Sequence, residues 1–257
     1  MDIAKGDDMN DGALPTRALS QLDMVHRLPA AKVVDRIGWL VRAAQGRSVV
    51  HVGFVDAGCW AYHDRFEVWL HERLDAVAAD LVGLDLDEQG VGYAVERGFA
   101  AHAVDACDVD AVRALELGRA DLVIAGEVIE HVHASGPFLE SMHELVRPGG
   151  SLVVTTPNAS GLLNAGAAAL VSREVNHPDH VGLFSCFTLS NLMDMHDWEV
   201  EAVATYVPEL KEFGSLRGRM RVLGAGAKLV LGLERLLGRL GRPYAADGLI
   251  VSARSRR

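Results

Sequence analysis

Residues 120–132 read ADLVIAGEVIEHV, in which the apolar run 122–126 is followed by two acids and a histidine. A short continuous apolar run is typical of a strand that is buried on both faces of a parallel sheet. Similar runs occur at 48–54, 80–87, 100–106 and 151–157, and stretches with a helical spacing of apolar residues separate them. This alternation predicts an α/β fold in which helices cover both faces of a mostly parallel sheet.

The same patterns assign the rest of the chain. Residues 1–16 are polar and are expected to be disordered, which leaves 17–257 as a single domain. The segment 158–185 is rich in loop-forming residues, and two more strands are predicted at 199–207 and 248–253. Helices are predicted at 28–44, 66–79, 88–97, 109–115, 136–146, 189–195 and 216–240.

The composition is that of a globular protein with a substantial core. Hydrophobic residues make up 49% of the 257 residues and charged residues 23%, which argues against wholesale disorder. The net charge of −10 disfavours nucleic acid as a partner, because a phosphate backbone would be repelled. The three cysteines have no CxxC spacing, and the N-terminal residues lack the apolar stretch of a signal peptide. Since no apolar run is long enough to span a bilayer, we expect a cytoplasmic protein.

The candidate site lies where the predicted strands end, because ligands of open parallel sheets bind at the carboxyl ends of the strands. The first strand ends in the turn 51–58, HVGFVDAG, where Gly53 lets backbone approach a ligand or simply closes a tight turn. Asp85 ends the second strand and could accept hydrogen bonds from ribose hydroxyls, whereas Asp87 suits a helix N-cap. Asp105 follows the third strand. Its carboxylate could accept a hydrogen bond from an adenine, or it could be another turn or cap residue.

Three segments together resemble the class I S-adenosylmethionine (SAM)-dependent methyltransferases. They are GLDLDEQGV at 83–91, DLVIAGEVIEHV at 121–132 and LVRPGGSLVVTTPN at 145–158. The resemblance is greatest to the branch that contains the ubiquinone-biosynthesis O-methyltransferases and many sugar and natural-product methyltransferases. It implies a Rossmann-like, doubly wound sheet of seven strands with an antiparallel last strand, and SAM as the cofactor. Residues 199–207 and 248–253 would then supply strands six and seven.

The resemblance also implies which residues bind SAM. The glycine-rich loop would contact the cofactor directly, and the ends of the second, third and fourth strands would bind ribose, adenine and the methionine part. The matching residues of the loop are His51, Gly53, Phe54 and Val55. Asp85 and Leu86 match the ribose position, Asp105 and Ala106 the adenine position, and Gly126 and Glu127 the position of the methionine part.

The glycine-rich loop departs from the family's pattern. The family usually has an acid where this sequence has His51, and glycines are common where it has Val55 and Ala57. Either the loop binds SAM through altered contacts, or the protein has lost affinity for SAM. We expect altered contacts, because a decayed site would have lost more than one of its strand-end residues.

Methyl transfer to a hydroxyl needs a base that takes the proton, and histidine suits this role near neutral pH. His131 follows the fourth strand, and His180 lies in the stretch that lines the acceptor pocket in the resembling family. Each is a candidate base or an ordinary structural histidine. His177, Asp179 and His180 are metal-binding residue types, but three ligands within four residues around a proline make poor coordination geometry. No metal is therefore expected.

The predicted helix 216–240 is an insertion before the last strand. Its basic residues are spaced by four, seven, seven and four, so they form one narrow stripe, and apolar residues fill most of the remaining surface. The helix could pack on the domain with its basic stripe in water. It could also act as a lid, form a homodimer contact or lie on an anionic membrane.

The function predicted is methyl transfer from SAM to a small-molecule acceptor, most simply a hydroxyl of a sugar, glycan or natural product. An N- or C-methyltransferase would need the same cofactor site. A non-catalytic scaffold or partner subunit would fit the altered first loop. An NAD-dependent oxidoreductase is disfavoured because no GxGxxG follows the first strand.

Overall fold

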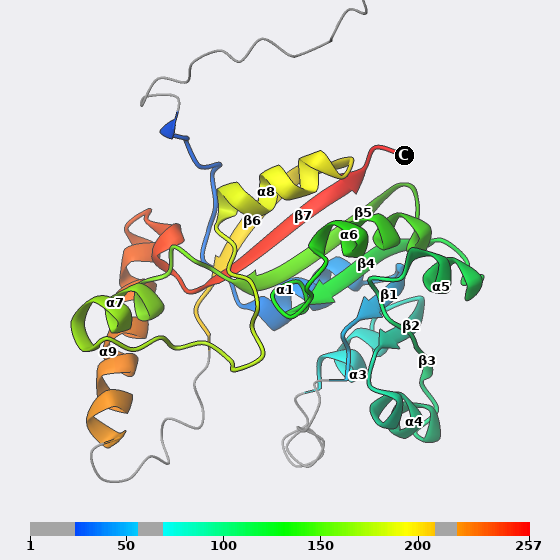
Figure 1. Cartoon of the computed structure of the whole chain (residues 1–257), viewed down its shortest axis with the longest axis horizontal. Coiled ribbons are helices and arrows are strands. Elements are labelled where there is room, and N and C mark those ends of the chain that lie inside the picture. Colours follow the sequence, from blue (N-terminus) through cyan, green and yellow to red (C-terminus); the bar gives the residue numbers. More distant parts are fainter. Residues whose placement is uncertain (1–23, 56–68, 209–219) are drawn as a thin grey trace, which may run out of the picture.

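The computed structural model describes residues 24–55, 69–208 and 220–257 (Figure 1). Within them, seven strands form one sheet in the order β3-β2-β1-β4-β5-β7-β6. β7 is antiparallel to β5 and β6, and the other neighbours are parallel. The predicted Rossmann-like sheet with an antiparallel last strand is therefore confirmed. The strands are β1 (Ser48–Val52), β2 (Asp80–Asp85), β3 (Ala100–Ala103), β4 (Ala120–Gly126), β5 (Val146–Pro157), β6 (Trp198–Tyr206) and β7 (Gly248–Ser255).

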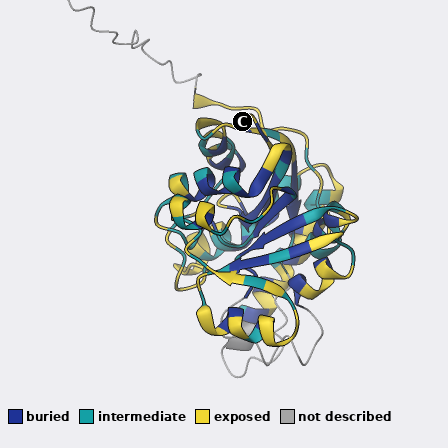
Figure 2. Ribbon diagram, turned by 90° about the vertical axis from the view of Figure 1, so that its right-hand side faces the viewer, coloured by how far each residue is buried: buried dark blue, intermediate teal, exposed yellow. Residues whose placement is uncertain are grey.

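Helices cover both faces of this sheet, and Figure 2 shows the buried strands between them. α1 and α3 bury their apolar residues against one face, and α5, α6 and α8 bury theirs against the other. In Figure 1, β5 runs toward α7 and α9, so these two helices lie at the carboxyl end of the parallel strands. The helices are α1 (Arg36–Ala44), α3 (Leu70–Asp75), α4 (Glu88–Glu96), α5 (Val109–Ala114), α6 (Ser135–Leu145), α7 (Leu162–Val171), α8 (Cys186–Met195), α9 (Met220–Arg239) and the short 3-10 helix η3 (Pro243–Ala245).

The first helix is shorter than the prediction of 28–44. α1 begins at Arg36 because the carboxylate of Asp35 caps it, accepting an N–H of the first turn at 2.8 Å. The residues before the cap are extended, and Val33 forms an isolated parallel bridge with Thr205 of β6. The part of the predicted helix that precedes Asp35 is therefore not helical. Its backbone pairs with the edge strand of the sheet.

The prediction of a loop over 158–185 is wrong in part, because this segment contains α7. The helix reads LLNAGAAALV and ends at Ser172, which adopts a left-handed φ of 52°. Alanine and leucine favour a helix, but the run is apolar on nearly every side. It therefore lacks the one-sided spacing from which an amphipathic helix is predicted.

α9 confirms the described part of the predicted helix 216–240. It packs on α7 through a small apolar cluster of Leu163, Ala227 and Leu231, and its basic residues Lys228 and Arg235 are exposed. No helix among the described residues combines the length and apolar content that crossing a bilayer requires. The predicted lead-in 1–16 lies outside the described residues.

Candidate functional site

The strand order reverses between β1 and β4, where the two loops that follow these strands meet. Gly53 ends β1 with a left-handed φ of 69°, and its N–H donates to the carbonyl of Leu84 at 2.8 Å. A Cβ at this position would overlap Val128, which follows β4. Only glycine allows this close approach, so the predicted role of Gly53 in a tight ligand-facing turn fits the backbone.

Asp85 ends β2 and holds the first loop in place. Its carboxylate accepts from the N–H of Val55 at 2.9 Å and from that of Asp87 at 3.0 Å. Burial raises the pKa of this carboxyl, and the backbone hydrogen bonds oppose the shift. Each oxygen can still accept a second hydrogen bond, as ribose binding would require. Asp87 caps α4 by accepting from Gln89 and Gly90, which confirms its predicted role.

The predicted adenine-side residues lie at the neighbouring strand end. Asp105 is exposed, and its carboxylate accepts from the N–H of Cys107 at 2.8 Å. Ala106 is partly buried beside it, and Leu86 is exposed at the end of β2. Contact of Leu86, Asp105 and Ala106 with SAM stays a prediction, as does the contribution of Ala57, which lies outside the described residues.

The side chain of His51 does not point to this edge. Its ring is buried on the α3 face of the sheet, with Nδ1 3.2 Å from Nδ1 of His71. Burial lowers the pKa of His51 well below its usual range, and lowers that of His71 to about 4. Phe54 and Trp69 complete this cluster, and the Trp69 indole N–H donates to the Phe54 carbonyl at 2.8 Å. The side chains of His51 and Phe54 are thus buried in the core. Only the backbone of these two residues could contact a cofactor.

Glu127 follows β4 and is held by two distant hydroxyls. Its Oε1 accepts from Thr155 of β5 and from Tyr206 of β6, each at 2.7 Å. The Arg36 guanidinium lies 5.7 Å from the centre of the Tyr206 ring. Glu127 has a left-handed φ of 58°, which costs a non-glycine residue about 1–2 kcal/mol. Such strain persists where the surroundings fix it, and it clusters at functional sites.

Glu130 lies fully buried behind this edge and joins two loops. Its Oε2 accepts from the Thr156 hydroxyl at 2.9 Å, and its Oε1 has no hydrogen-bond partner among the described residues. Burial, with the neighbouring Glu127, raises the pKa of Glu130 to about 8. Its carbonyl accepts from the N–H groups of Val181 and Gly182 at 2.8 and 3.1 Å. These two bonds fix the loop after α7 against the loop after β4.

That junction brings the two predicted base candidates together. The rings of His131 and His180 meet edge to face, 4.6 Å apart at their centres and inclined by 81°. His177 lies 5.7 Å from His131 and 5.8 Å from His180 by the same measure. Burial and the two neighbouring imidazoles lower the pKa of His180. This lowering favours the neutral ring, the form in which imidazole accepts a proton.

A cavity of about 510 Å³ opens beside these histidines. His177 and His180 line it, with Glu174, Asn176, Pro178, Val181, Gly182 and Leu183. This volume lies in the range of small-molecule sites. The acceptor stretch predicted around His180 therefore borders a space that a small acceptor could enter.

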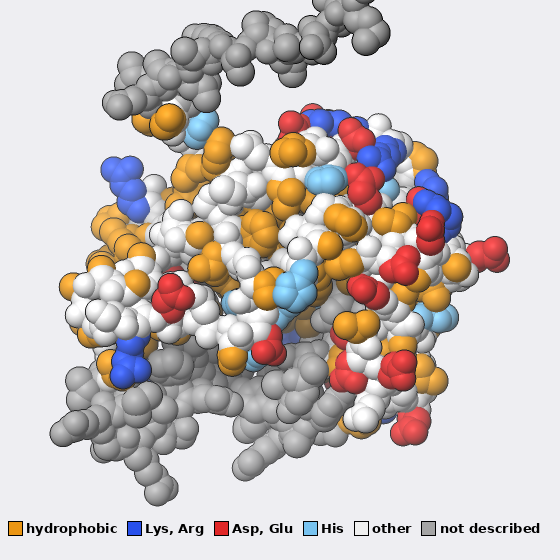
Figure 3. Space-filling view, in the orientation of Figure 1, with side chains coloured by type: hydrophobic (Ala, Val, Ile, Leu, Met, Phe, Trp, Pro, Cys, Tyr) orange, Lys and Arg blue, Asp and Glu red, His pale blue; other side chains and the backbone are white. Residues whose placement is uncertain are grey.

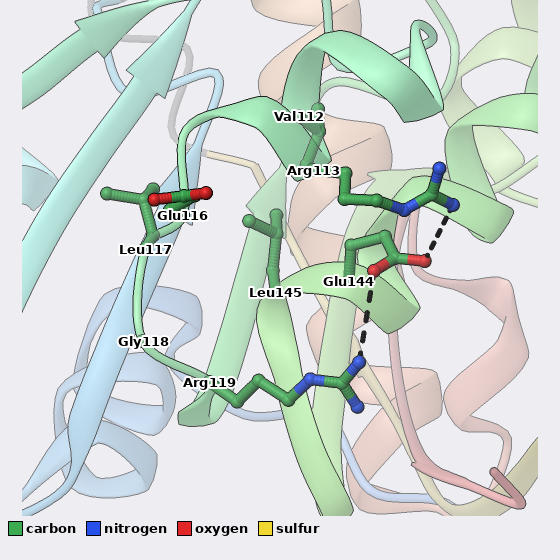
Figure 4. Close-up of a pocket in the computed structure, with 8 residues that line it drawn as sticks. All are labelled: Val112, Arg113, Glu116, Leu117, Gly118, Arg119, Glu144 and Leu145. Atoms are coloured by element: carbon green, nitrogen blue, oxygen red, sulfur yellow. Dashed lines mark hydrogen bonds and ion pairs between the residues drawn. The ribbon is translucent and has the colours of Figure 1, made fainter.

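A second cavity, of about 220 Å³, lies at the opposite end of the sheet, near the start of β4 (Figure 4). Glu144 stands between two arginines there, 3.1 Å from Arg113 and 3.8 Å from Arg119. Because both arginines face the Glu144 carboxylate, their charges are balanced within the protein, as is typical of a structural contact.

The comparisons with known proteins agree with this fold and site. Residues 30–203 match the methyltransferase domain family. A ubiquinone biosynthesis O-methyltransferase of Sinorhizobium fredii (strain NBRC 101917 / NGR234) is 36% identical over 109 residues, which cover 41% of this chain and 42% of that protein. The chain thus spans less than half the length of this curated relative.

Solved methyltransferases share the fold at low sequence identity. A SAM-dependent methyltransferase from Archaeoglobus fulgidus superposes with a TM-score of 0.52 at 14% identity, covering 85% of this chain and 92% of that one. The N-methyltransferase NodS from Bradyrhizobium japonicum WM9, in complex with S-adenosylhomocysteine, gives 0.50 at 13% identity and covers 86% of each chain.

The chain therefore belongs to the methyltransferase domain family, within the class I SAM-dependent methyltransferases, and SAM is the cofactor of that class. The residues present fit such a cofactor. Gly53 brings bare backbone to the strand crossover, Asp85 keeps acceptor positions for ribose, and Glu127 presents a carboxylate at the end of β4.

Sequence patterns missed several residues of this site. Tyr206 and Arg36 come from elements far from the strand-end motifs, and no local spacing connects them to Glu127. The sequence groups His177 only with Asp179 and His180 of the same loop, and nothing along the chain links it to His131. The polar residues at the end of the 151–157 run were the available signal for Thr155 and Thr156.

Proposed function

We propose that this protein transfers a methyl group from SAM to a hydroxyl of a small-molecule acceptor, such as a sugar, glycan or natural product. The observation that carries the proposal is the meeting of His131 and His180 at the carboxyl edge of the sheet. They come from separate loops, and His180 lines a cavity of about 510 Å³.

The cofactor, the walls of the cavity and the two histidines would each have a separate role in the reaction. Bound SAM supplies an electrophilic methyl group on a sulfonium. The walls of the cavity would position the acceptor oxygen, and such alignment is worth several kcal/mol of barrier lowering. The imidazole of His131 or His180 would take the proton of the acceptor hydroxyl. A positioned base of this kind contributes typically about 10²–10⁴-fold.

Calorimetric titration with SAM and S-adenosylhomocysteine tests the cofactor site. We expect micromolar binding that Asp85→Ala abolishes, because the variant removes both the ribose acceptor and the anchor of the Val55 N–H. Asp108→Ala is the matched control, since Asp108 also accepts two backbone N–H groups, but at the start of α5. Absence of binding to the intact protein would favour the scaffold alternative, in which His51 marks a lost site.

Variants of the two histidines test whether the methyl group is transferred to an oxygen or to a nitrogen atom of the acceptor. In an O-methyltransferase, the double variant His131→Ala/His180→Ala should lose at least about 10²-fold in kcat and keep its affinity for SAM. An N-methyltransferase often needs no strong base, so full activity of the double variant would point to a nitrogen acceptor.

We also propose that α9 makes a peripheral contact with an anionic membrane surface. Leu229, Leu233, Leu236 and Leu240 are 45% to 76% exposed. Their spacing of four, three and four residues aligns them in one stripe, called here the leucine stripe. In the described part of α9, every exposed charged side chain is basic, at Lys228, Arg235 and Arg239. Two paired copies of this helix would bring like charges together, whereas anionic lipid would complement them.

The acidic charge of the protein lies elsewhere. In Figure 3, Asp and Glu side chains gather over the part of this face formed by α4 and α5. That region is far along the sheet from α7 and α9 in Figure 1. A protein of net charge −10 can therefore still present a basic, apolar helix to an anionic surface.

A further inference from the structure

We propose that His131, His177 and His180 bind one divalent transition-metal ion of the Zn²⁺ type on the wall of the acceptor cavity. This site goes beyond methyl transfer. It rests on the proposed function only for the identification of the cavity as the acceptor's place.

The three side chains bring their ring nitrogens close together. Each offers one ring nitrogen, and these three atoms lie within 4.8 Å of one another. Imidazole nitrogens bind Zn²⁺ at about 2.0–2.1 Å, which places two ligands of a tetrahedral ion ~3.4 Å apart. Small rotations of the rings would close the difference. Three histidines leave a fourth position open, as in catalytic zinc sites.

The cluster contains a buried polar atom that a ligand would satisfy. Nδ1 of His180 is buried, and it has no hydrogen-bond partner in the part of the chain that the structure describes. A buried polar atom without a partner costs about 1–3 kcal/mol. Coordination at His180 would fix the tautomer of its ring and offset this cost.

The backbone sets the spacing of the ligands. The carbonyl of Glu130 accepts from Val181 and Gly182, so His131, which follows Glu130, and His180, which precedes Val181, are held next to each other, edge to face. The N–H of His180 also donates to the carbonyl of His177 at 3.1 Å, which closes the turn between the two loop histidines. The site is thus positioned by main-chain bonds on both sides.

Asp179 takes a place beside the cluster and is not among its ligands. Its Oδ2 lies 3.7 Å from Nδ1 of His177, as in the carboxylate–histidine–metal arrangements that orient metal ligands. The N–H of Asp179 donates to Nδ1 of His177 at 3.3 Å, so Nε2 carries the proton of the neutral ring, and an ion bound at Nε2 would move that proton to Nδ1, beside the carboxylate. His177, Asp179 and His180 alone would make poor coordination geometry, because they lie within four residues of the chain. In the folded protein His131, from another loop, takes the place of Asp179.

The ion would act on the acceptor. His177 and His180 line the cavity of about 510 Å³, so an acceptor oxygen in that cavity could take the open coordination position. A bound cation lowers the pKa of a coordinated hydroxyl, which favours acceptors with an oxygen nucleophile. His131 and His180 would then serve as ligands, and their lone pairs would not be available to take the proton.

His177 distinguishes the metal site from a simple histidine base. The full chain, stripped with a chelator, is titrated with Co²⁺ by visible absorption and with Zn²⁺ by calorimetry. We expect one ion per chain, and each of His131→Ala, His177→Ala and His180→Ala should weaken binding at least about tenfold. His133→Ala is the matched control, because His133 is exposed in the same loop and outside the cluster. The His177 side chain is 58% exposed, so its loss leaves the core intact.

Absence of Co²⁺ and Zn²⁺ binding to the intact chain would overturn the metal site, and so would binding that His177→Ala leaves unchanged. Titration of the same samples with S-adenosylhomocysteine separates the two proposals. Cofactor binding without metal binding refutes only the metal site, whereas metal binding without cofactor binding refutes only the methyl-transfer function.

Discussion

The hydroxyl of Tyr206 donates to Oε1 of Glu127 at 2.7 Å, and this bond joins the end of β6 to the loop after β4 across two intervening strands. Burial, together with the charge of Glu127, raises the pKa of Tyr206 well above its usual range, so the phenol keeps its proton and remains a donor. Thr155 supplies the second hydroxyl to the same oxygen. The carboxylate of Glu127, at the end of β4, is thus oriented by hydroxyls of β5 and β6.

Tyr206→Phe should weaken cofactor binding. The variant keeps the buried ring but removes one of the two hydroxyl donors to Glu127, a net loss of about 1 kcal/mol. We expect the affinity for S-adenosylhomocysteine to fall roughly three- to tenfold by calorimetry. Tyr93→Phe, on the surface of α4, serves as the control. Equal affinities of wild type and Tyr206→Phe would show that the orientation of Glu127 does not matter for binding.

The buried pair His51–His71 should make the fold sensitive to acid. An unfolded histidine takes up a proton near pH 6.5, whereas burial holds the pKa of folded His71 at about 4. The unfolded state therefore binds more protons between these values, and stability falls as the pH decreases from about 6.5 to 4. For His71 the loss is on the order of 3 kcal/mol at most.

The double variant His51→Leu/His71→Phe removes both titrating groups. Chemical denaturation between pH 7 and 4.5 should show a smaller decrease in unfolding free energy for this variant than for wild type. His102→Ala, on the exposed strand β3, should behave as wild type. Parallel pH dependences of the double variant and wild type would mean that other groups cause the acid sensitivity.

A buried carboxyl pair should give the opposite dependence at the junction of α7, α9 and β7. Glu234 and Asp247 both accept from the N–H of Leu163, at 3.1 and 3.0 Å. Burial raises the pKa of Glu234 to about 7 and that of Asp247 to about 6. Unfolded carboxyls release their protons near pH 4, so stability decreases as the pH rises from about 4 to 7.

Glu234→Gln replaces one acid of this pair by a neutral side chain of the same shape. Wild type should lose on the order of 5 °C in Tm between pH 5.5 and 8 from this junction, and the variant should lose less. Glu96→Gln, at the exposed end of α4, is the control. If wild type and Glu234→Gln keep the same difference in Tm at both pH values, Glu234 does not cause the pH dependence.

The leucine stripe of α9 should bind anionic vesicles. In flotation with phosphatidylglycerol-containing vesicles, we expect wild type to float and Leu229→Asp/Leu236→Asp to remain in the aqueous fraction, because the variant places charge in the apolar face. Added salt should weaken the interaction, since Arg235 and Arg239 attract the lipid headgroups. Leu170→Asp, on the exposed end of α7, tests whether any exposed leucine suffices. A stable dimer that Leu229→Asp/Leu236→Asp dissociates would show that the stripe pairs with a second copy instead.

Most of the sheet, and the residues at the carboxyl ends of its strands, could be predicted from local sequence patterns. Strands buried on both faces must be apolar throughout, so runs such as that of β4 can be recognised without a structure. Turn chemistry is equally local. The assignments of Asp85 to the strand end and of Asp87 to the cap of α4 depend on residues close in the chain, and both proved correct in position. Helix spacing failed for α7, because a helix that is apolar on nearly every side has no amphipathic period.

Which side chains meet at these strand ends depends on contacts that form only in the folded chain. His177 joins His131 because the carbonyl of Glu130 holds the loop after α7, and no spacing along the chain encodes that contact. His51 occupies a motif position, yet it turned out to face the core, because the alternation of β1 points its ring toward α3. Sequence patterns report the period and the turns of neighbouring residues. The partners of a side chain across the fold depend on strand order and on the paths of loops, which are fixed only when the whole core packs.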